Sequence, residues 1–176
     1  LEKLKPVVFE KSLGSIYDKV QRISKLAQWL AKQVDVEPKV AKEAAELCKC
    51  DLVTEIVFEF PELQGIMGYH YARHDKIAKP IASAIIEHYQ PRFSTDSLPK
   101  SDLGAVLAVS DRLDTLVGIL GIGKKPSGTK DPFALRRAAL GIIKIILVNT
   151  VVFIIKKDIM MGYYFTLVGI LWIVLL

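Results

Sequence analysis

The stretch Ser101-Asp-Leu-Gly-Ala-Val-Leu-Ala-Val-Ser-Asp-Arg-Leu-Asp-Thr-Leu-Val-Gly-Ile-Leu120 decides the fold class of this chain. Ser101 and Asp102 suit the start of a helix, and the apolar residues after them recur three and four positions apart. This spacing gives one apolar stripe, formed by Leu103, Val106, Leu107, Leu113, Leu116, Val117 and Leu120. The stretch therefore predicts an amphipathic helix over residues 101–120 that packs against other helices.

A basic loop punctuated by glycine and proline follows this helix, with the sequence Gly123-Lys-Lys-Pro-Ser-Gly-Thr-Lys-Asp-Pro-Phe-Ala-Leu-Arg-Arg137. Asp131 is a good N-cap and Pro132 suits the first position of a helix, so we predict a capped helix that begins at Pro132. The basic side chains would then surround one fixed turn, which suits the phosphates of RNA. The RNA-contact candidates are Lys124, Lys125, Lys130, Arg136 and Arg137.

Two other readings of this loop remain. The first is a solvated loop in which Arg136 or Arg137 pairs with an aspartate of the same domain, such as Asp111, Asp114 or Asp131. The second is a phosphate-binding loop, because Gly123 and Gly128 have the required spacing. Thr129-Lys130 reverses the usual order of that motif, and the loop follows a helix rather than a strand, so we do not expect it to bind ATP.

The rest of the chain up to residue 149 is also predicted to be helical. Residues 14–34 carry an apolar stripe that includes Ile23 and Leu30, and Pro38 starts the next helix. Further helices are expected over residues 51–60, 61–71 and 77–89, although the Val, Ile and Phe content of 51–60 leaves a strand open. Gly65 and Gly68 share one helical face and favour close packing. The fold class is all-α, a helical bundle whose core includes Met67, Leu113, Val117 and Leu135.

Composition restricts the function without naming it. The chain has 176 residues, a net charge of +5 and a pI near 9.1, which favours anionic partners. Cys48 and Cys50 are too few for a structural zinc site and have the wrong spacing for a redox pair, so we expect a reduced, cytoplasmic compartment. The chain begins with Leu1 rather than Met, so we expect it to be part of a longer protein. No secretory signal is visible at its start.

A metal-dependent phosphohydrolase is the main alternative among enzymes. All-α domains with a His…His-Asp…Asp ligand set cleave phosphoesters, and His74, Asp75 and Asp111 are the candidate ligands here. We reject them because no histidine precedes His70, and a protonated Lys49 would repel a divalent ion at the end of an earlier helix. We instead expect no metal site and no catalytic residue. His74 should lie on the surface, and His70 and His88 should be partly packed, while Asp111 and Asp114 should pair with lysine or arginine.

Five segments, taken in order along residues 1–149, resemble the bacterial glycyl-tRNA synthetase beta subunit family. They are Lys11-Ser-Leu-Gly-Ser-Ile-Tyr-Asp-Lys-Val20, Glu59-Phe-Pro-Glu-Leu-Gln-Gly-Ile-Met-Gly-Tyr69, Glu87-His-Tyr-Gln-Pro-Arg-Phe93, Ser110-Asp-Arg-Leu-Asp-Thr-Leu-Val-Gly118 and Lys125-Pro-Ser-Gly-Thr-Lys-Asp-Pro-Phe-Ala-Leu-Arg-Arg-Ala-Ala-Leu-Gly141. The resemblance implies that residues 1–149 form the HD-like helical domain of that subunit, with a degenerate metal site.

The resemblance also implies the functional setting. The intact enzyme attaches glycine to its tRNA, and its ATP and magnesium bind on the separate alpha subunit. This segment would therefore bind no cofactor of its own and would have a tRNA-binding or scaffolding role. The implied partners are the alpha subunit, the glycine tRNA and the remainder of the beta subunit.

The tail over residues 150–176 does not fit the family pattern. Residues 159–176 are uncharged, which is near the lower limit for a membrane span. The abrupt change in composition favours a reading-frame slip, with a buried helix or a membrane anchor as alternatives. A membrane-anchored interaction protein is therefore the last of the three functional readings.

Overall fold

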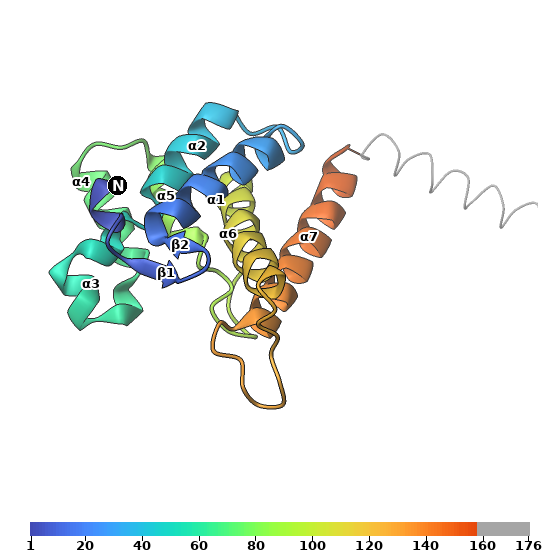
Figure 1. The fold of residues 1–176 in the computed structure, drawn as a ribbon. Helices are drawn as coiled ribbons and strands as arrows, with labels where there is room; N and C mark the ends of the chain where they lie inside the picture. The colour runs from blue at the N-terminus through green and yellow to red at the C-terminus, as the bar shows by residue number, and fades with distance from the viewer. Residues whose placement is uncertain (158–176) are drawn as a thin grey trace, which may run out of the picture. The chain divides into compact units, whose positions relative to one another are not determined.

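The structure, a computed structural model, describes the backbone of residues 1–157 and the side chains of residues 1–148. The chain divides into two compact units, residues 1–142 and residues 143–176, and the account below concerns the first unit unless stated otherwise. Its elements are mostly helices (Figure 1). In chain order, with η marking short 3-10 helices, they are η1 (Glu2–Leu4), β1 (Val8–Glu10), β2 (Gly14–Ser15), α1 (Ile16–Ala31), α2 (Pro38–Leu47), η2 (Cys50–Val53), α3 (Glu55–Glu59), η3 (Pro61–Leu63), α4 (Ile66–His74), α5 (Lys79–Glu87), α6 (Asp102–Gly121) and α7 (Leu135–Lys157).

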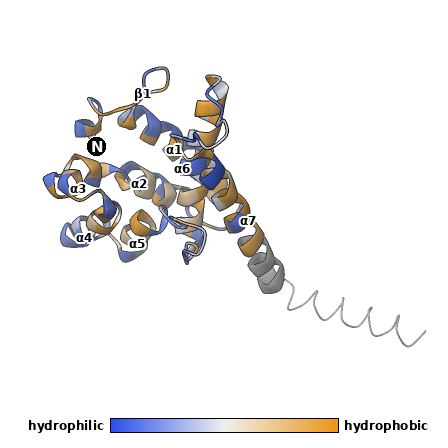
Figure 2. Ribbon diagram, turned by 90° about the horizontal axis from the view of Figure 1, so that it is seen from below, coloured by the Kyte–Doolittle hydropathy of each residue, from blue (hydrophilic) through white to orange (hydrophobic). Residues whose placement is uncertain are grey.

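The core lies between α1, α2, α5 and α6, which pack against one another. Hydrophilic and hydrophobic residues alternate along these helices (Figure 2), and the hydrophobic residues that they direct at one another are buried. The buried residues of this cluster are Ile23, Ala27, Ala31, Ala41, Ala44, Ala45, Cys48, Ile81, Ala84, Leu103, Val106 and Leu107. Many are alanines, so the helices can approach closely. The predicted all-α class is confirmed for the bundle.

The first helix starts two residues later than predicted. Ser15 is the N-cap of α1, and it forms a capping box in which its hydroxyl accepts from the Asp18 N–H while the Asp18 carboxylate accepts from the Ser15 N–H. Gly14 has a φ of +86° and pairs with Glu10 in a small antiparallel hairpin of β1 and β2. This hairpin leaves no signal in the sequence, because a strand of three residues is too short to show a period of two.

Three other helix starts agree with the sequence, whereas the helix expected over residues 61–71 is a 3-10 turn at Pro61–Leu63 followed by α4, which begins at Ile66. Pro38 opens α2, Pro80 lies in the first turn of α5, and Ser101 caps α6 by accepting from the Gly104 N–H. Residues 51–60 are helical, as η2 and α3, so the strand alternative is wrong.

Gly65 and Gly68 pack closely, as expected, Gly65 against the Tyr89 ring and the Ile85 backbone and Gly68 against side chains. The Asp51 Oδ2 atom accepts from the N–H groups of both glycines, at 2.6 and 3.2 Å, and so caps the start of α4 from a distant position. A Cβ atom on Gly68 would lie 2.7 Å from Ile85 Cγ2 and 3.1 Å from Asp51 Oδ2. Gly68 thus makes room for a buried carboxylate that binds the N–H groups of both glycines.

The predicted core residues are only partly correct. Leu135 is buried, Met67 and Leu113 are half-buried, and Val117 is 65% exposed, so the placement of Val117 in the core is wrong. Near Val117 the buried side of α6 is the opposite one. Ile119, about 200° around the helix from Val117, has no exposed area. In this half of α6 the inward side also carries the charged Asp111 and Asp114, and an apolar stripe cannot reveal such positions.

The last described element, α7, runs from Leu135 to Lys157 and so continues past Asn149. Residues 158–176 and the side chains after residue 148 lie outside the described part of the chain. The readings of the 150–176 tail as a frame-slip product, a buried helix or a membrane span therefore fall on residues or side chains that lie outside it. Among the helices that the structure describes, none has the length and apolar character needed to span a membrane.

Candidate nucleic-acid interface and buried lysine cluster

The basic loop leaves α6 through a fixed turn. Gly123 has a φ of +80° and donates its N–H to Leu120, while the Lys124 N–H donates to Ile119 O at 3.1 Å. This pair of bonds is the Schellman arrangement that ends many helices, and its left-handed position favours glycine. The backbone of Lys124 is therefore held by the helix that precedes it.

The tip of the loop is a tight two-residue turn. Ser127 and Lys130 exchange both backbone hydrogen bonds, at 3.0 and 2.9 Å, around Gly128 with a φ of +51°. The Lys130 backbone is therefore fixed by a local turn, as the glycine and proline content predicts.

The start of α7 differs from the prediction. The helix begins at Leu135 rather than Pro132, because Asp131 to Ala134 form a turn that ends with a φ of +52° at Ala134. Asp131 nevertheless acts as a cap, since its carboxylate accepts from the N–H groups of Leu135 and Arg136 at 2.8 and 3.0 Å. These two bonds lower the pKa of Asp131, and the bond from the Arg136 N–H has the larger effect.

Lys124 is tied to the protein. Its Nζ lies 2.6 Å from Glu10 Oε1 on β1, and Glu10 is 8% exposed. The Lys124 ammonium, together with the Ser12 N–H, lowers the pKa of Glu10. Because its charge is already balanced, Lys124 is a poorer phosphate ligand than the sequence alone suggests.

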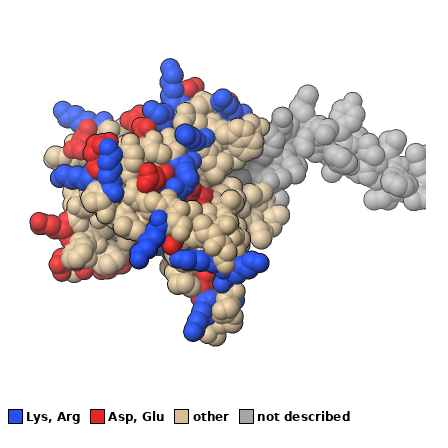
Figure 3. Space-filling view, in the orientation of Figure 1, with Lys and Arg blue, Asp and Glu red and all other residues tan. Residues whose placement is uncertain are grey.

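The other candidates remain on the surface. Lys125, Lys130, Arg136 and Arg137 are exposed, and blue side chains gather on the protrusion at the bottom of Figure 3, which is the loop between α6 and α7 in Figure 1. Within the described residues, neither Lys125 nor Lys130 has a carboxylate within 4.0 Å. Both line a hollow of about 350 Å³ that the loop forms with residues 131–135.

The two arginines differ, as their successive positions on a helix suggest. Arg137 donates from its guanidinium to the carbonyl oxygen of Arg92 at 3.2 Å, whereas the carboxylate of Asp131 accepts from the backbone of Arg136. Among the described residues, neither guanidinium pairs with Asp111 or Asp114.

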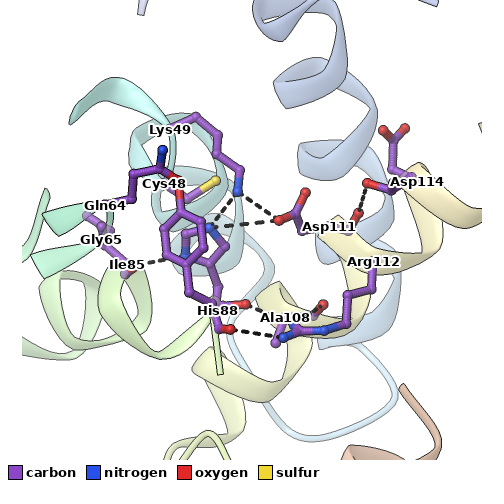
Figure 4. Close-up of polar contacts among 12 residues, drawn as sticks. Cys48, Lys49, Gln64, Gly65, Ile85, His88, Ala108, Asp111, Arg112 and Asp114 are labelled. Carbon is purple, nitrogen blue, oxygen red and sulfur yellow. Dashed lines mark hydrogen bonds and ion pairs between the residues drawn. The ribbon is translucent and has the colours of Figure 1, made fainter. Parts of the chain in front are cut away.

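Asp111 and Asp114 lie in a buried cluster of charged residues that joins α1, α2, α5 and α6 (Figure 4). The Lys49 Nζ, just after α2, lies 2.7 Å from Asp111 Oδ2 and 2.8 Å from Nε2 of His88 at the end of α5. The Lys19 Nζ on α1 lies 2.8 Å from Asp111 Oδ1. Lys19, Lys49 and His88 are 4%, 6% and 0% exposed, so these contacts exclude most water. We call these four residues, Lys19, Lys49, His88 and Asp111, the lysine cluster.

A second group of contacts continues the cluster along α1. Asp114 Oδ1 accepts from Arg22 Nε at 2.6 Å, and Asp114 Oδ2 lies 3.2 Å from Lys19 Nζ. Arg112 points to the other side of α6 and donates to the carbonyl oxygens of His88, Tyr89 and Pro91. The expectation that both aspartates form salt bridges is confirmed.

The electrostatics of the lysine cluster depend on pairing. Burial alone would raise the pKa of Asp111, but the Lys19 and Lys49 ammonium groups hold it well below its usual range. Burial alone would lower the pKa of Lys49, but Asp111 more than offsets this and raises it. Burial and the adjacent Lys49 both lower the pKa of His88, so its imidazole is neutral at pH 7.

The other histidines lie elsewhere. His74 and Asp75 contact each other at 3.1 Å with side chains that are 87% and 73% exposed, which confirms the surface position of His74. His70 is exposed rather than partly packed, and only His88 is buried. In the described part of the chain, no three His, Cys, Asp or Glu side chains are grouped as metal ligands.

Burial raises the pKa of Cys48 to about 12, as for an inert core thiol.

Sequence reasoning missed the roles of Lys19, Lys49 and His88. One signal was present, since Lys19 directly precedes Val20 on the buried side of α1 and Lys49 directly follows the buried Cys48. Charged residues next to core positions often require a partner of opposite charge, but the sequence does not show which one.

Comparison with known proteins places these features in a family. The family model described as glycyl-tRNA synthetase beta subunit matches residues 1–164. The glycine–tRNA ligase beta subunit of Coxiella burnetii is 57% identical over 147 residues, which are 84% of this chain and 21% of the relative. Those of Chromohalobacter salexigens and Escherichia coli O1:K1 are 54% and 52% identical over 143 and 146 residues, or 81% and 83% of this chain and 21% of each relative. The chain thus spans about a fifth of the length of these relatives.

Proposed function

Because the chain belongs to the glycyl-tRNA synthetase beta subunit family, we propose that it contributes to a glycine–tRNA ligase as a tRNA-binding and scaffolding segment. In this proposal the enzyme joins glycine to its tRNA in the cytoplasm, and ATP and magnesium act on the alpha subunit. The segment supplies no catalytic residue, and its partners are the alpha subunit, the glycine tRNA and the rest of the beta subunit.

The exposed lysines of the rigid loop are the observation that carries the RNA-binding part of this proposal. Lys125 and Lys130 extend from a backbone that is fixed by the end of α6 on one side and by the Ser127 turn on the other. A rigid backbone lowers the entropy that is lost when the loop binds a phosphate. Arg136 adds a positive charge in the first turn of α7, where the helix dipole also favours an anion.

The test is charge reversal in the assembled enzyme. Lys125→Glu with Lys130→Glu should weaken tRNA binding and make its dependence on salt less steep, because fewer counterions are released. The slope of log K against log salt should fall by roughly 1–2 for two lost phosphate contacts. Formation of glycyl-adenylate should be unchanged. Lys124 is left intact, because a glutamate there would face Glu10.

A matched control changes the same charge elsewhere. Lys25 and Lys79 are exposed on α1 and α5, and their double replacement by glutamate alters the net charge equally. We expect the control to keep the wild-type slope. Equal tRNA affinity and equal slope in the loop variant and the control would assign the loop to contacts within the protein.

We also propose that the bundle has the HD-like architecture, with lysines at positions where metal ligands would be needed. This is supported by the lysine cluster, in which Lys49 and Lys19 are both directed at Asp111. The phosphohydrolase alternative relied on His74 and Asp75, which are exposed and contact each other rather than Asp111.

A further inference from the structure

The contact between Lys49 and His88 is unusual, because it joins an ammonium group to a neutral imidazole inside a core. The His88 Nδ1 lies 2.6 Å from the carbonyl oxygen of Ile85, which can only accept a hydrogen bond. Nδ1 therefore carries the proton, and the lone pair of Nε2 is directed at Lys49 Nζ, 2.8 Å away. Figure 4 shows Lys49 and Asp111 reaching this point from different helices.

This arrangement has the features of a metal-binding histidine. A ligating imidazole usually donates its second N–H to a backbone carbonyl, which fixes the ring and makes the other nitrogen a better donor of its lone pair. Ligating carboxylates are usually held by a further hydrogen-bonding or charged group, and here Lys19 Nζ lies 2.8 Å from Asp111 Oδ1. The protein itself thus holds both the His88 ring and the Asp111 carboxylate in a fixed orientation.

The separation of the two donors also fits an ion. His88 Nε2 and Asp111 Oδ2 are 3.9 Å apart. Zinc bonds to imidazole nitrogen and to carboxylate oxygen are each about 2.0–2.2 Å, so one ion can reach both atoms, at an angle wider than the tetrahedral one until the side chains adjust. The Lys49 ammonium lies within 2.8 Å of both atoms, and the face of the Tyr89 ring lies 4.2 Å from it, which further favours a cation.

We propose that the Lys49 ammonium is an internal substitute for a divalent metal ion, occupying a site between His88 and Asp111 that needs one more donor to bind the metal. The natural chain supplies two donors at this point, and the lysine supplies the positive charge that would otherwise come from the ion. The site therefore links α2, α5 and α6 without depending on metal supply. This inference rests on the proposed loss of a metal site in the bundle and deepens it, and it does not depend on the RNA-binding role of the loop.

The first experiment replaces the cation with the missing donor. In the full chain, Lys49→His adds a second imidazole, and two imidazoles with one carboxylate form a ligand set for Zn²⁺ or Co²⁺. We expect about one Co²⁺ per chain, seen by its visible absorption bands, with an affinity at least about tenfold higher than in Lys49→Gln. The Gln variant removes the same charge without adding a good ligand, and a Lys49→His, His88→Gln double variant should lose the gain.

The same variant remains informative if it folds poorly. Unfolding that Zn²⁺ or Co²⁺ reverses, as followed by circular dichroism, would support the site because the metal then replaces the lost ammonium. A Lys49→His chain that takes up no more metal than Lys49→Gln would overturn the proposal, and so would one that stays unfolded with metal present.

The second experiment needs no substitution. The chain has three histidines, so the ring nitrogens of His88 can be followed by NMR in the native protein beside those of His70 and His74. We expect His88 to keep the Nδ1–H tautomer at neutral pH, with its Nε2 unprotonated and shifted by the contact with Lys49. The opposite tautomer, or a proton on Nε2 at neutral pH, would contradict the inference.

Discussion

Single residues decide how closely the elements of this protein approach one another. Gly68 leaves room for Asp51 and Ile85, and Asp51 in turn caps α4 from a position seventeen residues earlier in the chain. Lys49 acts at the same scale, since one ammonium group contacts a carboxylate from α6 and an imidazole from α5. In each case one residue, either a glycine or a buried charged residue, allows elements that are distant in sequence to meet.

Gly68→Ala tests the close approach to Asp51. A Cβ at this position would lie 2.7 Å from Ile85 Cγ2, and Ile85 is 1% exposed, so the core has little room to adjust. We expect a loss of about 1–3 kcal/mol in the free energy of unfolding, as for other overpacked cores.

Gly121→Ala is the matched control, because Gly121 is also helical and a Cβ there meets no atom within 4 Å. Alanine should stabilise that position by up to about 1 kcal/mol. If urea denaturation gave both variants the same stability change, the contact of Gly68 with Asp51 and Ile85 would not be tight.

At the scale of elements, α6 changes its surroundings along its length. Every residue from Leu103 to Ser110 is buried, since α1, α2 and α5 surround that half. In the second half, Asp111, Asp114 and Gly118 face α1 and the segment before it, and Val117 faces solvent. The inward face of α6 is thus apolar at its start and charged further on, because the lysines of the cluster lie beside it.

Substitutions along α6 should reflect this change. Leu107 has no exposed area, so Leu107→Ala should cost roughly 2–5 kcal/mol in the free energy of unfolding. Val117→Ala should change it by less than about 0.5 kcal/mol, because the side chain is 65% exposed. Thermal or chemical denaturation of both variants measures the difference. A larger cost at Val117 than at Leu107 would mean that the two halves are assigned to the wrong environments.

At the scale of the whole molecule, the lysine cluster links stability to pH. The pKa of His88 is lower in the folded protein than in the unfolded chain, so below about pH 6.5 the unfolded chain takes up a proton that the folded protein does not. Asp111 also has a lowered pKa, and its contribution is lost as the pH falls below about 4. Lys49 has a raised pKa, so its contribution is present at neutral pH and starts to be lost above about pH 10.4.

We therefore expect the protein to lose stability as the pH falls from 6.5 to 5, with His88 contributing up to about 1.4 kcal/mol per pH unit. His88→Gln should lower stability at pH 7 but should also flatten this part of the pH profile, because glutamine does not titrate. Denaturation at several pH values compares the two proteins. An unchanged slope between pH 5 and 6.5 in the variant would show that His88 takes up its proton equally in the folded and the unfolded protein.

The sequence by itself determined the helical class, the starts of α2, α5 and α6, the fixed turns of the basic loop and membership of the family. These features depend on local signals: the spacing of apolar residues, capping by Ser101 and Asp131, prolines in first turns, and glycines at positions of positive φ. Tertiary structure decided the pairing of charges. Lys124 pairs with Glu10 across 114 positions, and Lys19 and Lys49 pair with Asp111 across 92 and 62 positions. Such partners are chosen by the packing of helices in space, so no period or motif along the chain predicts them, and for the same physical reason the apolar spacing of α6 does not reveal that Lys49 is buried and Val117 is exposed.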